Sequence, residues 1–189
     1  MLKIILNQYR CIPVWLFVCT SRMKMIIVDD LHRYKELDQI NDHDYIAFCK
    51  LLINKFEFRT QISYRLSSDS KIKGFISRIL FKGQAALYIT TKDIGSGLYI
   101  QHGFATIISA KQIGRNAYIN QQVTIGYNGM NNPIIGDGVR ICAGAKIVGG
   151  ITVGDRSIIG ANAVVVKDVP SDVTMGGVPA YVIRRHDNA

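Results

Sequence analysis

The sequence predicts a mainly β protein: a parallel β-helix built from hexapeptide repeats, preceded by a small α-helical N-terminal region. First, isoleucine or valine returns every six residues through most of the second half of the chain. Second, small or β-branched residues stand four positions after most of them. A unit of one short strand and one corner keeps one side chain inward every six residues, because strands alternate with period two. Such repeats are typical of parallel β-helices. The two series are Ile107, Ile113, Ile119, Ile125, Ile135, Ile141, Ile147, Val153, Ile159 and Val165, and Ala117, Val123, Val139, Ala145, Ile151, Ser157, Ala163 and Val169.

Glycines mark the expected corners of this β-helix, where a Cβ would clash as the backbone turns. Three strands close a triangular coil, so eighteen residues make one turn. With the less regular units at Ile94 and Ile100, the count is twelve strands in four coils. Only the interval from Ile125 to Ile135 departs from six, by four residues, which predicts a loop within YNGMNNP. Binding residues often lie on loops held by a rigid scaffold.

The N-terminal third carries helical signals. Apolar residues at 45, 48, 49, 52, 53 and 56 predict a helix between Asp44 and Lys55, with Asp44 or Asn41 as its N-cap. The stretch SSDS at 67–70 predicts a loop. The apolar run CIPVWLFVC at 11–19 is too short to span a bilayer, so we expect a buried element or a shallow membrane contact.

The segment KIKGFISRILFK at 71–82 predicts a basic amphipathic helix. A helix of this kind can lie on an anionic membrane surface. Most amphipathic helices instead pack their apolar face on a core, and a helix that covers the end of a β-helix also protects its unpaired strands. We favour the covering role and keep the membrane contact as the alternative. The apolar face holds Ile72, Phe75, Ile76, Ile79 and Leu80, and the cations outside it are Lys71, Lys73, Arg78 and Lys82.

Composition is that of an ordinary soluble globular chain. Of the net charge of +9, most lies in residues 1–92, which hold 15 Lys and Arg against 8 Asp and Glu. No basic and aromatic motif for nucleic acid occurs, so no nucleic-acid partner is expected. Four cysteines without CxxC spacing indicate reduced buried thiols and a cytoplasmic location. Only one of four histidines lies in the repeats, which argues against a metal-dependent β-helix enzyme.

Five segments carry a resemblance to a known family: GLYIQHGFATII, INQQVTIG, AGAKIVG, VVVKDVP and GGVPAYVI. The chain resembles the left-handed β-helix acyltransferases, and among them the serine acetyltransferase branch with its relatives in polysaccharide loci. The likeness covers roughly residues 85–185 and suggests a helical region at 1–84 and an acetyltransferase domain at 85–189. The left hand follows from the resemblance alone, since parallel crossovers are ordinarily right-handed.

The resemblance implies transfer of acetyl from acetyl-CoA to a hydroxyl group, without a metal. It places the catalytic base at His102, between neighbouring subunits of a homotrimer. Chemistry agrees, because a hydroxyl that attacks a thioester must lose its proton, and imidazole titrates near neutrality. The alternative is a structural histidine whose nitrogens are satisfied within the fold.

The resemblance also implies a coenzyme A groove between adjacent prisms. Small residues there let backbone amides approach the pantetheine arm, a lysine lies near the nucleotide phosphates, and GGVPA closes the end of the groove. A backbone N–H near a glycine is the expected donor to the oxyanion of the tetrahedral intermediate. The residues expected in these roles are, in that order, Ala143, Gly144 and Ala145, then Lys167, then Gly177 and Pro179, then Gly126.

The expected acceptor site departs from the serine acetyltransferase pattern. That pattern has an aspartate before the histidine and another one strand earlier, where this chain has Gln101 and Leu87. It has an Arg-His pair before the loop proline, where this chain has Asn131 and Asn132. Neutral amides suit a polyol better than a zwitterion. We therefore expect a sugar hydroxyl of a capsule, O-antigen or exopolysaccharide unit as acceptor, with Tyr127 of the loop among its contacts.

Two alternatives remain open from the sequence. One is O-acetylation of L-serine in cysteine biosynthesis, and the other is a non-catalytic β-helix scaffold. In either enzymatic reading we expect a cytoplasmic homotrimer. Peripheral contact of the basic N-terminal region with the inner face of a membrane stays the alternative to the covering role.

Overall fold

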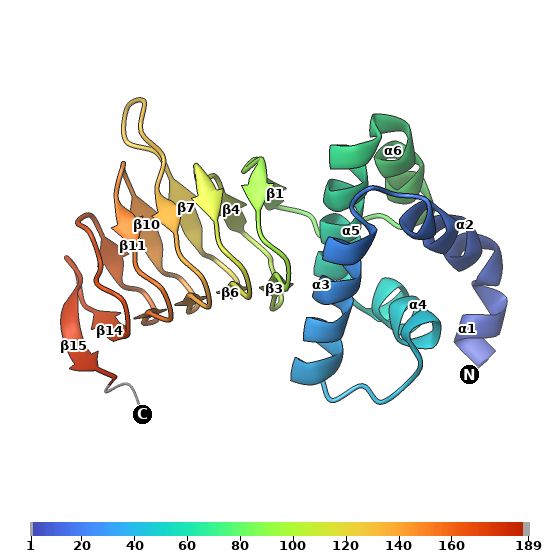
Figure 1. Ribbon diagram of the computed structural model, residues 1–189, viewed down its shortest axis with the longest axis horizontal. Coiled ribbons are helices and arrows are strands. Elements are labelled where there is room, and N and C mark those ends of the chain that lie inside the picture. The colour runs from blue at the N-terminus through green and yellow to red at the C-terminus, as the bar shows by residue number, and fades with distance from the viewer. Residues whose placement is uncertain (1, 187–189) are drawn as a thin grey trace. The chain divides into compact units, whose positions relative to one another are not determined.

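The chain folds into two compact units, residues 1–85 and 86–189, in a computed structural model that describes residues 2–186. The first unit is helical, and the second is a parallel β-solenoid (Figure 1). The prediction of a mainly β chain with a helical N-terminal region is therefore confirmed.

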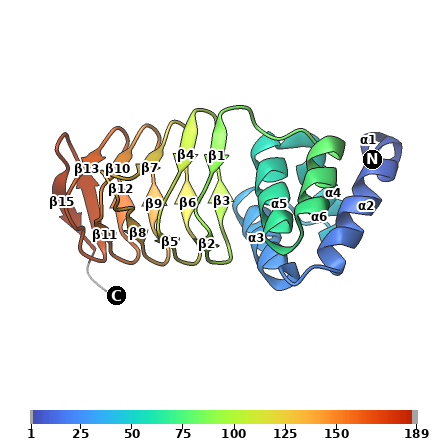
Figure 2. The ribbon, with the colours of Figure 1, turned by 90° about the horizontal axis from the view of Figure 1, so that it is seen from above.

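Three parallel sheets form the solenoid, because the chain visits each in turn and then repeats (Figure 2). The first sheet contains β1 (Leu87–Ile89), β4 (Thr106–Ile108), β7 (Thr124–Gly126), β10 (Lys146–Val148) and β13 (Val164–Val165). The second contains β2 (Asp93–Ile94), β5 (Gln112–Ile113), β8 (Ile134–Ile135) and β11 (Thr152–Val153). The third contains β3 (Tyr99–Ile100), β6 (Tyr118–Ile119), β9 (Arg140–Ile141), β12 (Ile158–Ile159), β14 (Val173–Gly176) and the antiparallel β15 (Tyr181–Arg185). The parallel strands exceed the predicted twelve, because β1 precedes and β14 follows the regular repeats.

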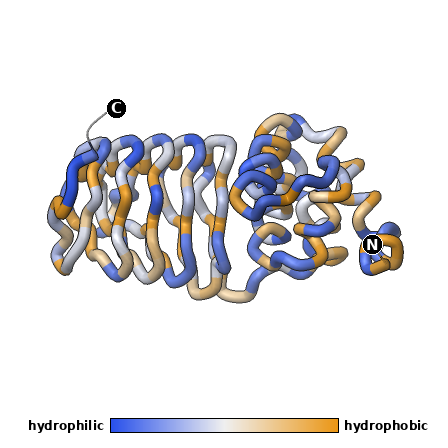
Figure 3. Tube along the Cα trace, turned by 90° about the horizontal axis from the view of Figure 1, so that it is seen from below, coloured by the Kyte–Doolittle hydropathy of each residue, from blue (hydrophilic) through white to orange (hydrophobic). Residues whose placement is uncertain are grey.

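The interior of the solenoid is a set of stacked aliphatic columns. In the third sheet Ile119, Ile141 and Ile159 are in register, and none of their side chains reaches solvent. The corner residues Ala117 and Ser157 are also fully buried, as the second series predicts. Figure 3 shows the same alternation as short hydrophobic and hydrophilic segments that follow one another around the coils. Burial of these side chains is the main favourable contribution to the stability of this unit.

Glycines occupy corners where successive coils touch. A Cβ on Gly114 would lie 2.7 Å from the backbone N of Asp137 in the next coil, closer than any real Cβ contact. Asp137 itself accepts a hydrogen bond from the backbone N of Arg115 (2.6 Å). The corner therefore has room for the backbone alone and is held by a carboxylate of the neighbouring coil.

For one residue of the aliphatic series, the prediction that its side chain faces inward is wrong. Ile107 is 42% exposed, and its neighbour Ile108 fills the inward position opposite Ile125. The cause lies in the preceding corner. Ile108 stands eight residues after Ile100, whereas Ile125 stands six after Ile119, so this corner holds two extra residues. The predicted series allows for only one of them, and the second moves the inward position from Ile107 to Ile108, because a shift of one residue exchanges the two faces of a strand.

The helical unit has six helices among the described residues: α1 (Leu2–Leu6), α2 (Gln8–Cys19), α3 (Lys24–Leu37), α4 (Asp44–Asn54), α5 (Phe56–Asp69) and α6 (Lys71–Leu80). Its core is aromatic. Phe58 packs edge to face against Tyr34, with ring centroids 4.9 Å apart, and against Phe48, at 5.8 Å. None of the helices in residues 2–186 is both long and apolar enough to cross a membrane.

Local signals at the helix ends were partly misleading. The helix predicted after Asp44 is confirmed as α4, but its N-cap is His43, and Asp44 instead binds Lys35 and His32. The predicted loop at 67–70 is wrong, because α5 continues to Asp69. The hydroxyl of Ser67 donates to the carbonyl of Ser63 (2.7 Å), so this serine is accommodated within the helix.

The predicted amphipathic helix forms as α6, yet a different face of it is packed. Gly74 and Ser77 are buried against the unit, whereas Ile72, Phe75 and Ile79 are exposed. A Cβ on Gly74 would lie 2.8 Å from the backbone N of Ser67, so α5 and α6 approach closely through small residues.

An ion pair lies inside the helical unit. Arg65 donates from Nε and Nη2 to the two carboxylate oxygens of Asp30 at 2.9 and 3.2 Å, and both side chains are almost fully buried. Two charges removed from water are tolerated only when they neutralise each other with good geometry.

We expect Asp30→Ala to lower the free energy of unfolding of the helical unit by about 3 to 5 kcal/mol, because it leaves the Arg65 charge buried without its partner. Urea denaturation followed by circular dichroism measures this loss. Arg156→Ala is the matched control. It breaks the exposed pair with Asp172 and should cost much less, because solvent screens the two charges. Equal losses in the two variants would contradict the role of the buried pair.

Candidate functional site

Two corners of the solenoid carry the candidate residues. The third–first corner comprises the segments that lead from the third sheet to the first: 101–105, 120–123, 142–145 and 160–163. The first–second corner comprises the segments that lead from the first sheet to the second: 90–92, 109–111, 127–133 and 149–151. The order of the strands therefore determines which side chains of one chain can lie close together.

His102 lies exposed at the third–first corner, in the segment with the two extra residues. Its φ is +66°, and Gly103 follows at +61°, so two successive residues adopt the left-handed conformation. Other corner residues, such as Asn116 and Gln122, share this conformation, so it belongs to the corner and not to the chemistry of the histidine. Among residues 2–186 the imidazole has no hydrogen-bond partner, so both ring nitrogens are available to a ligand or to another chain.

Gln101 is held by a polar network on the third sheet. Its Oε1 accepts hydrogen bonds from the Tyr118 hydroxyl (2.5 Å) and from Nδ2 of Asn120 (3.0 Å). The ring of Tyr118 is in turn covered by the Arg140 guanidinium, 4.5 Å from its centroid. Because the amide oxygen is already bonded, Gln101 presents its Nε2 donors beside His102 rather than an acceptor.

No carboxylate takes the place that the resemblance gives to a partner of the histidine. Leu87 in β1 pairs with Thr106 and is only 6% exposed. The orientation of His102 therefore cannot depend on an aspartate at this position. Burial also raises the pKa of the Cys142 thiol at the same corner, so this group stays protonated at neutral pH and is no competing nucleophile.

A cavity of about 710 Å³ opens at the first–second corner. Its charged lining consists of Lys92 and Lys111, and no carboxylate takes part. Neither ammonium group has a hydrogen-bond or ion-pair partner among the described residues. The cavity therefore favours a ligand with a neutral or negatively charged group. Its lining residues are Thr90, Lys92, Ser109, Ala110, Lys111, Met130, Asn131, Asn132, Ile134, Gly150, Ile151 and Thr152.

The long loop after β7 forms one wall of this cavity. Nδ2 of Asn132 donates to the carbonyl oxygen of Ser109 (2.8 Å) and contacts its hydroxyl (3.2 Å). Asn128 and Asn131 close the loop with an antiparallel bridge, whereas Tyr127 and Met130 are exposed. Asn132 thus anchors the loop, and Asn131 and Tyr127 remain open to a ligand.

The residues expected at coenzyme A have the small size that a backbone approach needs. Gly144 has φ +74°, and a Cβ there would lie 2.0 Å from Oδ1 of Asn162. Ala143 is half-buried beside it. Gly177 borders the same corner, because its carbonyl accepts from the Val164 backbone N (3.1 Å). The third–first corner therefore fits an extended ligand lying against main chain.

One chain does not bring the candidate residues together. The third–first corner holds Gln101, His102, Ala143, Gly144, Ala145, Gly177 and Pro179. The first–second corner holds Gly126 at the end of β7, then Tyr127, Asn131 and Asn132. Lys167 lies on the same side, in the segment that leads from β13 to the bridge of Val169 with Val153 in the second sheet. A site that used both sets would need two prisms side by side, each giving a different corner.

Sequence reasoning missed Lys92 and Lys111. Both precede an inward isoleucine by two residues, Ile94 and Ile113, so they occupy the same position in successive coils. This repetition is the signal that could have found them. Among residues 2–186 no three His, Cys, Asp or Glu side chains gather in a way that could hold a metal ion.

Comparison with known proteins agrees with this geometry. The family model "Bacterial transferase hexapeptide (six repeats)" matches residues 132–167. A serine acetyltransferase of Staphylococcus xylosus is 42% identical over 98 residues, which are 49% of this chain and 45% of that protein. One of Synechococcus elongatus is 40% identical over 97 residues, or 49% and 40% of the two chains. The repeat unit is therefore similar to the hexapeptide-repeat domains of serine acetyltransferases.

Solved structures extend the likeness beyond the repeats. A serine acetyltransferase of Neisseria gonorrhoeae gives a TM-score of 0.66 at 27% identity, covering 89% of this chain and 67% of that one. That of Brucella abortus gives 0.68 at 26% identity, covering 88% and 70%. A serine acetyltransferase in complex with CoA gives 0.64 at 25% identity, covering 84% and 68%. The chain spans less than half the length of the two curated relatives that it matches.

We expect Asn132→Ala to loosen the loop at 127–133, because the variant removes both of its side-chain contacts with Ser109. Hydrogen–deuterium exchange should then be clearly faster in a peptide covering this loop and unchanged in the strands on either side. Met130→Ala is the control, since that side chain is 96% exposed. Unchanged exchange in Asn132→Ala would show that the loop is held by other contacts.

Proposed function

We propose that the protein is an O-acetyltransferase that moves acetyl from acetyl-CoA to a hydroxyl acceptor. The observation that carries this proposal is an exposed histidine without an internal partner, on a hexapeptide solenoid similar to serine acetyltransferases. Its place in an otherwise regular corner, where two residues are inserted, argues against a purely structural role. The activity of the whole protein is a proposal, because this chain matches less than half of the length of these relatives.

In the proposed reaction, a ring nitrogen of His102 takes the proton from the acceptor hydroxyl as the oxygen attacks the thioester carbonyl. The C–S bond then breaks, the imidazolium returns its proton to the leaving thiolate, and the products are the acetyl ester and coenzyme A. The tetrahedral oxyanion needs a preorganised N–H donor, for which Gly126 remains our proposal. Ala143, Gly144 and Ala145 would lie along the pantetheine arm, and Lys167 would meet a nucleotide phosphate.

We propose that the active form is a homotrimer. Contact of the third–first corner of one prism with the first–second corner of the next is heterologous, and three such contacts close a ring. This arrangement would place His102 and Gln101 of one chain opposite Tyr127, Asn131 and the lysine-lined cavity of its neighbour. The trimer is supported by the division of the candidate residues between two corners, neither of which is a complete site by itself.

L-serine is the acceptor that the relatives favour. The curated relatives and the solved structures with which the chain compares carry the name serine acetyltransferase. The comparisons therefore support the serine alternative better than the sugar acceptor that the sequence pattern suggested. The carboxylate of serine would find Lys92 or Lys111 in the cavity.

A sugar hydroxyl remains the second candidate because of one specific feature of the site. The two corners offer neutral amides at Gln101, Asn131 and Asn132, and the cavity holds no carboxylate to meet the ammonium group of serine. A sugar of a capsule, O-antigen or exopolysaccharide precursor with a phosphate or carboxylate group would match its two cations.

We propose a cytoplasmic location, because acetyl-CoA is an intracellular donor and all four cysteines are free. The expectation of buried thiols is met only by Cys11 and Cys49, since Cys19 is exposed and Cys142 is half-buried. A peripheral contact with the inner face of a membrane is part of this proposal and rests on the helical unit.

We expect His102→Ala to lower kcat about a hundredfold or more with either acceptor while the affinity for coenzyme A is retained, because the variant removes the general base. Thiol release from acetyl-CoA, measured with L-serine and with a panel of sugars and sugar nucleotides, gives both the acceptor and the effect of the variant. His43→Ala is the control. Wild-type turnover in His102→Ala would rule out the base, and no turnover or coenzyme binding in the wild type would favour a scaffold.

We expect partial rescue when two defective chains share a trimer. His102→Ala damages one corner, and Asn131→Ala with Asn132→Ala damages the other, so each homotrimer is impaired. In co-expressed, randomly mixed trimers about a quarter of the sites would combine two intact corners. Mixing the purified homotrimers without exchange is the control. Activity of the co-expressed sample no higher than that of the separate variants would mean that the site does not span two chains.

A further inference from the structure

The exposed face of α6 is the more hydrophobic one. Small residues, Gly74 and Ser77, occupy the packed side and let α6 lie close to α5. On the opposite side Ile72 is 70%, Phe75 62% and Ile79 66% exposed. Their spacing of three and four residues places them in one stripe along the helix. The pattern therefore leaves a complete apolar face in contact with solvent.

Helix α2 has a second stripe of the same kind. It buries Cys11, Val14 and Val18 in the helical unit. The residues Tyr9, Ile12 and Leu16 follow the same spacing on the other side and are 72%, 47% and 55% exposed. An exposed stripe on one helix is common, whereas two on neighbouring helices make a patch of a size seen at interaction sites.

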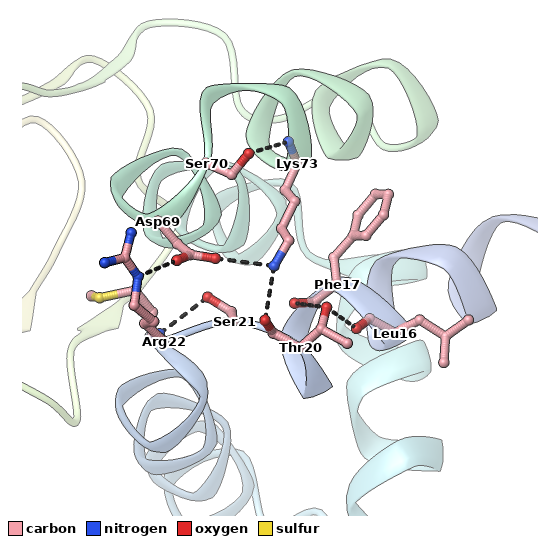
Figure 4. A network of polar contacts seen from close by, with 9 residues as sticks. Leu16, Phe17, Thr20, Ser21, Arg22, Asp69, Ser70 and Lys73 are labelled. Atoms are coloured by element: carbon pink, nitrogen blue, oxygen red, sulfur yellow. Dashed lines mark hydrogen bonds and ion pairs between the residues drawn. The ribbon is translucent and has the colours of Figure 1, made fainter.

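Contacts at both ends show that α2 and α6 lie side by side and antiparallel. Nε of Arg10 donates to the carbonyl of Leu80 (2.7 Å), which joins the start of α2 to the end of α6. Nζ of Lys73 donates to the carbonyl of Thr20 (2.9 Å) and to Asp69 (3.0 Å), which joins the end of α2 to the start of α6 (Figure 4). These ties fix the rotation of both helices about their axes.

The two stripes lie on the same side of this helix pair. On each helix the side that meets the other helix is about a quarter turn from the buried side and about a quarter turn from the exposed stripe. Since the helices are antiparallel and both bury their inner sides in the same unit, both stripes point outward together. We call this surface the outer face: Tyr9, Ile12, Leu16, Ile72, Phe75 and Ile79.

The charged residues that belong to α1, α2 and α6 are all positive. Helices α1, α2 and α6 contain no aspartate or glutamate. Lys71, Arg78 and Lys82 are exposed near the apolar stripe of α6, and none of them has an ion-pair partner among the described residues. An apolar face with a basic margin matches the boundary between phosphate headgroups and acyl chains.

We propose that the outer face docks on the surface of an anionic phospholipid bilayer. The six apolar side chains enter the headgroup boundary, and Lys71, Arg78 and Lys82 meet lipid phosphates. Docking of a second copy on this face is disfavoured, because a symmetric contact would bring the two basic margins together with no acid between them. The inference does not depend on the acetyltransferase activity.

Vesicle co-sedimentation tests the proposal with the full chain. Vesicles of phosphatidylcholine mixed with phosphatidylglycerol should retain the protein, and vesicles of phosphatidylcholine alone should retain much less. Ile72→Ser with Phe75→Ser and Ile79→Ser removes half of the apolar face and should abolish retention. Lys71→Gln with Arg78→Gln and Lys82→Gln should weaken it about fivefold for each charge and remove the preference for anionic lipid.

Ile183→Ser with Arg184→Gln is the matched control, because it removes an exposed apolar residue and an exposed cation from β15 in the other unit and should leave retention unchanged. Sedimentation velocity on every variant reports its mass and its folded state. Failure of the wild-type protein to bind anionic vesicles would overturn the proposal. Retention of lipid binding by the apolar variant would also overturn it. If the wild-type protein does not bind vesicles and the apolar variant forms a smaller assembly than the wild type, the outer face is a contact between copies of this chain instead. Acetyl transfer in solution is measured in parallel on the same samples. This assay tests the proposed reaction, so a failure of lipid binding and a failure of the acetyltransferase activity can be told apart.

Discussion

Stacking of one coil on the next, through backbone hydrogen bonds at a fixed register, is the constraint on which the repeat unit depends. A strand of two or three residues cannot hold its shape alone, so each coil is ordered by the coils before and after it. The columns through Ile119, Ile141 and Ile159 and the close corner at Gly114 all require this register. The same stacking displays every corner segment at a set height, which makes the corners suitable positions for chemistry.

Periodicity reveals such a fold well, because one inward side chain per unit leaves a direct trace in the sequence. It fails where the chain inserts residues without changing the hydrophobic character of the next strand. Ile107 and Ile108 have the same side chain, so the sequence does not show which of them faces inward after the longer corner at 101–105. The segment around Ser67 was misjudged for a similar reason, since serine can satisfy its hydroxyl inside a helix as well as in a loop.

The candidate site was predictable to the extent that its residues carry distinctive chemistry. His102 stands out as the one histidine in the repeats, and the long loop stands out as a break in the count. Lys92 and Lys111 do not, because a lysine at a corner looks like an ordinary solvated side chain. The packed face of α6 was also hidden, since helical spacing defines an apolar stripe but says nothing of whether glycine and serine allow a closer contact on the other side.

The last strand has a consequence for how chains of this kind stay apart. β15 runs antiparallel to β14 and pairs with it from Val173 to Gly176, so the outer edge of the third sheet at β14 is already paired. A solenoid that ended on a bare parallel rung would offer a template on which an identical chain could continue the spiral. By turning back on itself after β14, the polypeptide covers this edge, on which a strand of an identical chain could otherwise pair.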